Sequence, residues 1–130
     1  MTNDQLVRAA SYARENAYPP YSGFKVGAAL EDAAGRVHTG CNVENASYGL
    51  TVCAERVALW KAMSEGVRIF RRIAVVTAAD TLTPPCGACR QLLWEFCGNI
   101  EVILGNLRGD SRVIHMADLL PDAFDDKAFR

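Results

Sequence analysis

The chain has 130 residues, with 14 lysines and arginines against 15 aspartates and glutamates, and its formal net charge is −1. This length predicts one domain spanning residues 1–130, large enough for a hydrophobic core but short for one subunit to enclose a pocket alone. A nucleic-acid partner is disfavoured, because binding a phosphate backbone requires a basic face.

The apolar segments are too short for a membrane span, so no membrane partner is expected. Residues 1–4 also lack the basic and then apolar pattern of a signal segment. The five cysteines therefore fit a reducing cytoplasm, where cysteine clusters bind metal more often than they form disulfides.

The first half of the chain predicts one helix and then a pair of strands. Thr2 and Gln5 have the spacing of a capping box, and Tyr18-Pro19-Pro20 ends the helix. Between them runs an apolar stripe at helical period, formed by Leu6, Ala9, Ala10, Ala13 and Ala17. Strands are expected over residues 24–30 and 37–41, joined by a turn at residues 32–35.

The second half alternates helices and strands. Helices are expected from Cys53 to Gly66 and from Cys86 to Gly98, with strands over residues 73–78, 100–104 and 112–115. The link between the last two strands is too short for a helical crossover, so these strands should be antiparallel. The pattern predicts a three-layer α/β/α sandwich around a five-stranded mixed sheet.

A split group of cysteines carries the clearest chemical signal. Cys53 precedes Glu55 by two residues, and Cys86 and Cys89 form a Cys-x-x-Cys pair. Three thiols can bind one zinc ion and leave its fourth position open, as in catalytic rather than structural zinc sites. A Cys-x-x-Cys pair alone would fit a structural zinc or a redox pair equally well. The third thiol and the nearby carboxylate favour catalysis.

Helix geometry restricts this site further. Residues i and i+2 of a helix face opposite ways, so Cys53 and Glu55 can share a pocket only if Cys53 lies at or just before the first turn. All three thiols would then lie at helix N-termini, which favour thiolates. Three thiolates leave the zinc site with a net charge of −1, and Arg56 is a candidate to draw charge from the sulfurs.

Each of these residues also has a less specific interpretation. Glu55 could be a solvated carboxylate in the first turn of a helix. Cys41 and Cys97 are expected to fill core space rather than bind metal. His38 and His115 are read as ordinary packed or edge residues of strands.

Four segments together resemble a known family. They are residues 24–30 (FKVGAAL), 42–48 (NVENASY), 53–56 (CAER) and 85–91 (PCGACRQ). Their order and spacing are similar to those of the small homotetrameric cytidine deaminases, within the zinc-dependent cytidine and deoxycytidylate deaminase superfamily, from about residue 18 to residue 124. The zinc motif alone would fit several groups of deaminases, whereas the four segments together are specific.

The resemblance implies hydrolysis of cytidine and deoxycytidine to uridine and deoxyuridine with release of ammonia, a reaction of pyrimidine salvage. It implies that Cys53, Cys86 and Cys89 hold one Zn²⁺ per subunit, whose activated water attacks C4 of the base. Glu55 would take the proton of that water and pass protons to N3 and to the departing amine.

The resemblance also implies the substrate contacts. Asn42 and Glu44 would bind the ribose hydroxyls, and Phe24 and Ala54 would line the pocket. A carboxylate at the outer end of the sugar would repel a phosphate, which favours free nucleosides. Phe124 would reach the pocket of a neighbouring subunit in a homotetramer with shared active sites. Without the resemblance, these positions would be read as a polar loop, a core aromatic and a tail residue.

Two alternative functions remain open from the sequence. A deaminase of another aminopyrimidine nucleoside, such as a nucleoside antibiotic, would share the zinc chemistry and differ in its pocket. A non-catalytic, zinc-stabilised interaction domain would not need Glu55. An RNA or DNA editor is disfavoured by the acidic balance and the lack of basic runs.

Overall fold

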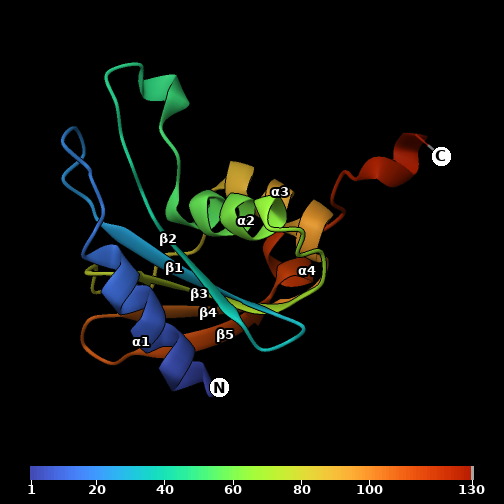
Figure 1. Ribbon diagram of the computed structural model, residues 1–130, viewed down its shortest axis with the longest axis horizontal. Helices are drawn as coiled ribbons and strands as arrows, with labels where there is room; N and C mark the ends of the chain where they lie inside the picture. Colours follow the sequence, from blue (N-terminus) through green and yellow to red (C-terminus); the bar gives the residue numbers. More distant parts are fainter. Residues whose placement is uncertain (130) are drawn as a thin grey trace.

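A five-stranded mixed sheet forms the centre of the computed structural model, which describes residues 1–129 (Figure 1). The strand order is β2-β1-β3-β4-β5, in which β3 and β4 are parallel and the other neighbours antiparallel. The strands are β1 (Val26–Asp32), β2 (Val37–Cys41), β3 (Phe70–Thr77), β4 (Glu101–Asn106) and β5 (Ser111–His115). The predicted sheet and the antiparallel pairing of its last two strands are confirmed.

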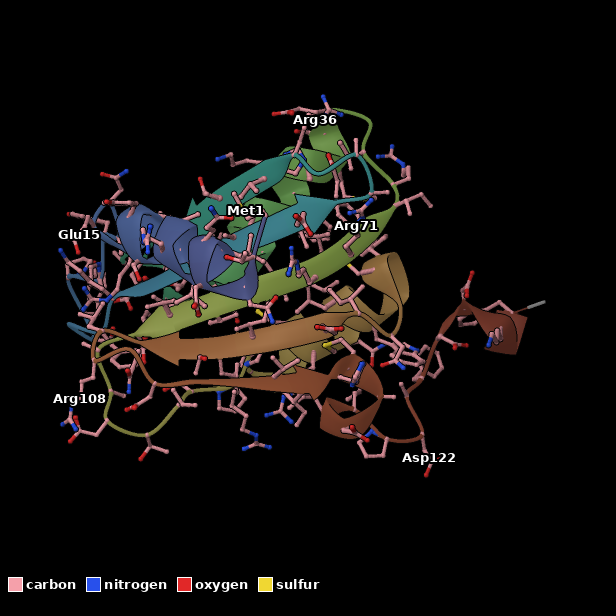
Figure 2. The ribbon with its side chains drawn as sticks, turned by 90° about the horizontal axis from the view of Figure 1, so that it is seen from below. Met1, Glu15, Arg36, Arg71, Arg108 and Asp122 are labelled. Atoms are coloured by element: carbon pink, nitrogen blue, oxygen red, sulfur yellow. The ribbon has the colours of Figure 1, made fainter. Side chains whose placement is uncertain are left out.

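Helices cover both faces of this sheet. Helix α1 (Asn3–Arg14) lies across one face, where it buries a small core over β1, β3 and β4 (Figure 2). Helices α2 (Ala54–Ser64) and α3 (Gly87–Cys97) cover the opposite face, where most of the buried apolar side chains gather. The three-layer arrangement is therefore confirmed. Within residues 1–129, no helix is long and apolar enough to cross a bilayer.

Three short helical segments were not expected from the sequence. They are η1 (Tyr48–Leu50) in the long β2–α2 connection, α4 (Met116–Leu119) after β5, and η2 (Asp126–Phe129) near the C-terminus. Helix α4 contributes Met116 to the core beneath α2 and α3. Segments of three or four residues are too short to show a helical period in the sequence.

The predicted start of α1 is confirmed, but its predicted end is not. The Thr2 hydroxyl accepts a hydrogen bond from the Gln5 N–H, and the Gln5 side chain accepts one from the Thr2 N–H, which completes the capping box. The helix ends at Arg14, before the last alanine of the predicted stripe. Beyond it, Tyr18 pairs with Val43 in an isolated bridge, so the tertiary pairing of this segment replaces the last helical turn.

The first strand begins at Val26 rather than at Phe24, because a side chain takes over the pairing at that end. The Asn42 side chain accepts a hydrogen bond from the Val26 N–H and donates one to the Phe24 carbonyl, both at 2.8 Å. Phe24 is therefore held in a loop before β1. The third strand is longer than predicted, since its pairing with β1 extends to Phe70 through two arginines that obscure the apolar pattern.

One glycine allows α2 to approach the sheet closely. A Cβ atom on Gly40 of β2 would lie 2.5 Å from the Ala54 carbonyl oxygen and 2.5 Å from the Ala58 nitrogen, both backbone atoms of α2. Only a residue without a side chain fits at such a separation. Gly40 therefore fixes where the first turn of α2 lies against the sheet.

The predicted turn between β1 and β2 is confirmed and contains a buried contact between an aspartate and a histidine. One oxygen of the buried Asp32 carboxylate accepts hydrogen bonds from the Ala34 and Arg36 N–H groups. The other lies 2.9 Å from Nε2 of His38, which is also buried. His38 is thus a packed residue, whereas His115 is exposed on the edge strand β5.

Candidate active site

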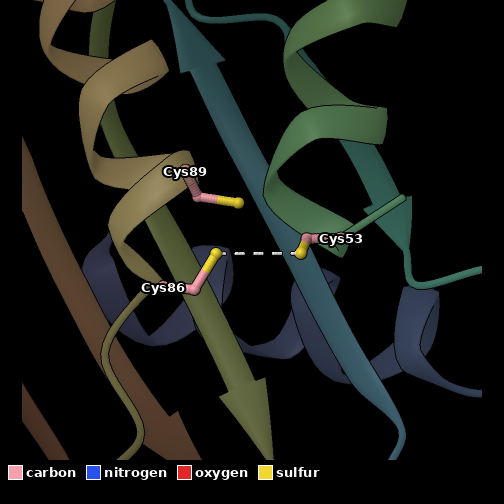
Figure 3. A group of neighbouring side chains, drawn as sticks. All are labelled: Cys53, Cys86 and Cys89. Carbon is pink, nitrogen blue, oxygen red and sulfur yellow. Dashed lines mark hydrogen bonds between the residues drawn. The ribbon is translucent and has the colours of Figure 1, made fainter. Parts of the chain in front are cut away.

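The three cysteines of the predicted metal site meet at the N-termini of α2 and α3. Cys53 is the N-cap residue of α2, Cys86 is the N-cap residue of α3, and Cys89 lies in the first turn of α3. Their sulfur atoms all lie within 4.8 Å of one another, and they point toward a common centre (Figure 3). The predicted position of Cys53, just before the first turn, is confirmed.

The dimensions of this cluster suit a zinc ion. The sulfurs of Cys53 and Cys86 are 3.9 Å apart, whereas two sulfurs about 2.3 Å from a tetrahedral zinc would be separated by about 3.8 Å. Thiolates are soft ligands that zinc accepts readily. Cys41 and Cys97 lie outside the cluster, and Cys97 packs against the main core as expected, where burial raises its pKa to about 12.

The pKa values of two thiols in the cluster are shifted in opposite directions. The pKa of Cys53 is lowered to about 5, first by a hydrogen bond from Cys89 and further by the positive charge of Arg56. The same hydrogen bond, together with burial and the nearby Glu55 carboxylate, raises the pKa of Cys89. The thiolate is the form that binds metal, so the lowered pKa of Cys53 favours metal binding.

Arg56 lies beside the cluster, as predicted. One of its Nη nitrogens donates a hydrogen bond to the Thr51 carbonyl at 2.9 Å and lies 3.8 Å from the Cys53 sulfur. The carbonyl fixes the guanidinium, and the sulfur then receives a charge-assisted contact. The contact is confirmed, while its effect on zinc chemistry remains a prediction.

Glu55 is buried, so the interpretation of it as a solvated surface carboxylate is wrong. Only 4% of this residue is exposed, although it lies in the first turn of α2. The pKa of Glu55 is raised to about 7, first by burial and also by the negative charge of Cys53. One zinc ion with three thiolates would still carry a net charge of −1. A cluster that holds zinc would therefore also raise the pKa of Glu55.

A cavity of about 300 Å³ opens beside the cluster. Its lining includes Val26, Val75 and Thr77, from the region where the start of β1 pairs with the end of β3. The lining includes Cys53, Glu55 and Cys86. Four other predicted residues also line the cavity, namely Phe24, Asn42, Glu44 and Ala54. The fold thus brings residues that are far apart in the sequence into one cavity.

The polar side chains of Asn42 and Glu44 are buried and already partly engaged. One carboxylate oxygen of Glu44 accepts hydrogen bonds from the N–H groups of Tyr21 and Ser22, at 3.1 and 3.0 Å. The other accepts one from the Ser22 hydroxyl at 2.5 Å. This hydroxyl is the main cause that lowers the pKa of Glu44, so the carboxylate stays ionised at neutral pH.

Phe124 lies outside the described lining of this cavity. Its side chain is 62% exposed, in a C-terminal segment that extends away from the sheet (Figure 1). The Gln91 side chain donates a hydrogen bond to the Phe124 carbonyl at 2.6 Å, and the rings of Phe124 and Phe129 meet edge to face at 5.9 Å. The chain by itself therefore gives Phe124 no role in its own pocket.

Comparison with known proteins identifies the family. The profile described as the cytidine and deoxycytidylate deaminase zinc-binding region matches residues 1–105. The chain belongs to this family. Its fold, a mixed five-stranded sheet between helices, is that of solved cytidine deaminases, and its cysteine cluster fits the one zinc ion per subunit of this zinc-binding family.

Individual relatives of this deaminase family are similar over nearly the whole chain. The cytidine deaminase of Halalkalibacterium halodurans is 54% identical over 125 residues, which covers 95% of each chain. That of Sporosarcina psychrophila is 50% identical over 125 residues, covering 95% of this chain and 92% of the relative. The crystal structure of cytidine deaminase from Burkholderia pseudomallei has a TM-score of 0.93 at 55% identity, covering 95% of this chain and all of the other.

Several lining residues of this deaminase were not found from the sequence. Ser22, Tyr48 and Thr51 line the cavity, as do Thr83 and Pro84 from the loop before α3. These residues lie in loops, where no periodic pattern indicates which side chains face inward. The only indication in the sequence that Ser22 belongs to the cavity is its position two residues before Phe24.

Proposed function

We propose that this protein is a cytidine deaminase, which hydrolyses cytidine and 2′-deoxycytidine to uridine and 2′-deoxyuridine and releases ammonia. The observation that carries this proposal is a buried carboxylate, Glu55, in the same cavity as two thiols of a zinc-sized cysteine cluster. The close relatives named above support it. The reaction is one of pyrimidine salvage, and we propose a cytoplasmic location for this single-domain enzyme.

The roles proposed for the cluster follow from its chemistry. Cys53, Cys86 and Cys89 would hold zinc, and Arg56 would draw negative charge from the Cys53 sulfur. When bound, zinc would activate a water molecule as the nucleophile near neutral pH. Glu55 would accept the proton of that water and deliver protons to N3 and to the departing amine. A carboxyl group whose pKa is about 7 can both take up and release a proton at neutral pH.

The proposed substrate contacts follow from the remaining lining. Phe24 would pack beside the ring and sugar, Ala54 would lie against the base, and Asn42 and Glu44 would bind ribose hydroxyls. Glu44 has a free acceptor position on the oxygen that the Ser22 hydroxyl already contacts. Among the described residues that line the cavity, two are carboxylates and none is a lysine or arginine. This charge disfavours phosphorylated substrates and supports free nucleosides.

We further propose that the enzyme is a homotetramer in which Phe124 completes the pocket of a neighbouring subunit. Aromatic side chains are exposed around the cavity, and Tyr48 of the lining meets Tyr21 with ring centroids 6.1 Å apart. Exposed aromatic patches of this kind are typical of interaction surfaces. The exposed Phe124 on an extended segment is suited to cover such a surface.

Conversion of cytidine to uridine by wild type and Glu55→Gln, with zinc content measured in both, tests the proposal. The amide keeps the size of the side chain but cannot accept the proton, so turnover should fall at least about 100-fold while zinc is retained. Glu95→Gln, on the exposed surface of α3, is the matched control and should keep full activity. Unreduced turnover in a zinc-loaded Glu55→Gln protein would contradict the assigned role.

A substrate panel separates the alternative functions. An enzyme for another aminopyrimidine nucleoside would turn over that compound much faster than cytidine. A non-catalytic zinc domain would convert none of them, although its zinc content would be normal. Glu44→Gln should also improve the relative activity on cytidine monophosphate, because it removes the charge that repels phosphate while its amide oxygen can still accept the two backbone N–H groups.

A further inference from the structure

A single hydroxyl group links two segments that line the cavity, one with Ser22 and Phe24 and one with Asn42 and Glu44. The Ser22 hydroxyl donates a hydrogen bond to one Glu44 carboxylate oxygen at 2.5 Å and accepts one from the Phe24 N–H at 3.1 Å. Ser22 itself lines the cavity. The direction of both bonds is determined, because a carboxylate can only accept and a backbone N–H can only donate.

These bonds constrain the Glu44 carboxylate. Its first oxygen receives two backbone N–H groups, from Tyr21 and Ser22, which occupy both of its acceptor positions. Its second oxygen receives the Ser22 hydroxyl, so one acceptor position remains. The hydroxyl therefore determines in which direction the last free acceptor of Glu44 can receive a hydrogen bond.

The same hydroxyl constrains the loop that carries Phe24. The Phe24 N–H is held by Ser22, and the Phe24 carbonyl accepts a hydrogen bond from the Asn42 side chain at 2.8 Å. Both polar groups of this residue's backbone are thus fixed by side chains rather than by strand pairing. Without the hydroxyl, one Glu44 oxygen would lose a partner in a part-buried region, and the Phe24 N–H would lose its partner in an exposed loop.

We propose that Ser22 is a positioning residue that directs the free acceptor of Glu44 toward the sugar of the substrate while it holds the loop that carries Phe24. This inference rests on the proposed function and names the residue that sets its sugar selectivity. Ser22 makes the pocket recognise sugar hydroxyls through Glu44, and it takes no part in proton transfer. Its loss should therefore affect substrates in proportion to the hydroxyl groups that they offer.

The test compares cytidine with 2′,3′-dideoxycytidine, which lacks both ring hydroxyls of the sugar. Ser22→Ala should lower kcat/KM for cytidine by about tenfold, mainly through KM, because one bond to a charged acceptor is lost. For the dideoxy substrate the loss should be less than about threefold. Ser22→Thr retains the hydroxyl and should recover most of the activity on cytidine. Ser11→Ala on α1 is the control serine and should change neither substrate.

A double substitution tests whether Ser22 affects kcat/KM through Glu44. In a Glu44→Gln background, Ser22→Ala should reduce kcat/KM for cytidine by much less than in wild type, because the two residues act through one contact. Equal losses of kcat/KM on both substrates, or additive losses in the double variant, would overturn the inference. Ser22 would then have only a structural role. Failure of wild type to convert cytidine would instead overturn the proposed function, and the inference with it.

Discussion

The sulfur atoms of Cys53 and Cys86 lie 3.9 Å apart although the two residues are 33 positions apart in the sequence. Each residue caps a helix, and both helices begin at the same end of the sheet. The geometry of the metal centre therefore depends on where two helix starts are packed. A substitution that moves one of these starts should damage the centre without touching a cysteine.

Gly40→Ala is the substitution that tests this dependence. The added methyl group would meet two backbone atoms of α2 at 2.5 Å, so the helix must move. We expect the free energy of unfolding to fall by about 1–3 kcal/mol, as in other overpacked cores, and zinc content and turnover to fall with it. Gly49→Ala is the matched control, because its Cβ would meet nothing within 4 Å. Full zinc content and turnover in Gly40→Ala would show that the site does not depend on this packing.

Arg56→Gln should weaken zinc retention. The guanidinium lies 3.8 Å from the Cys53 sulfur and contributes to the lowered pKa of that thiol. Loss of this positive charge favours the protonated thiol, so zinc affinity should drop by about 10–100-fold. Competition with a chromogenic chelator measures the affinity directly. Arg8→Gln, on the exposed surface of α1, is the control for loss of a positive charge. Equal affinities of wild type and Arg56→Gln would remove the proposed role.

The metal centre could be predicted from the sequence because its ligands follow local rules. Helix periodicity alone requires Cys53 to lie at a helix start if it is to share a pocket with Glu55, and the structure places it at the N-cap. The spacing of Cys86 and Cys89 similarly places both on one side of the start of α3. Helix periodicity is sufficient to predict the relative positions of side chains that lie within one helical turn.

The part of the cavity lined by Asn42 and Glu44 could not be predicted in the same way. The bonds of Asn42 to Val26 and Phe24 join residues 16 and 18 positions apart, and those of Glu44 to Ser22 and Tyr21 join residues 22 and 23 positions apart. Such pairs form between loops, which carry no period, and they also move the start of β1 away from Phe24. Only the resemblance to a family indicated that Asn42 and Glu44 belong to the pocket.

Asp32→Asn should lower the free energy of unfolding at neutral pH and change how this free energy depends on pH below about 4. A hydrogen bond from His38 lowers the pKa of Asp32, and two backbone N–H groups lower it further. A lowered folded pKa means that the stabilisation is fully present above the ordinary aspartate value of about 3.9 and is lost as the pH falls through the folded value. The difference in unfolding free energy between wild type and Asp32→Asn should therefore be larger at pH 7 than at pH 3.

Denaturant titrations of both proteins at the two pH values measure this difference. Asp122→Asn removes an exposed carboxylate from the C-terminal segment and is the control. It should produce a much smaller difference at pH 7 than Asp32→Asn does. A difference for Asp32→Asn that is the same at pH 3 as at pH 7 would mean that the charged form of Asp32 contributes nothing to stability.

Phe124 should act in the pocket of a neighbouring subunit rather than in its own. Phe124→Ala should lower kcat/KM for cytidine by about tenfold through the loss of buried aromatic surface, whereas Tyr12→Ala on exposed α1 should not. The decisive measurement co-expresses Phe124→Ala subunits with inactive Glu55→Gln subunits under two affinity tags. In a mixed tetramer, a pocket with an intact Glu55 can receive an intact Phe124 from its neighbour, so activity per intact Glu55 should rise toward wild type. Activity that stays at the level of Phe124→Ala alone would place this side chain in its own subunit.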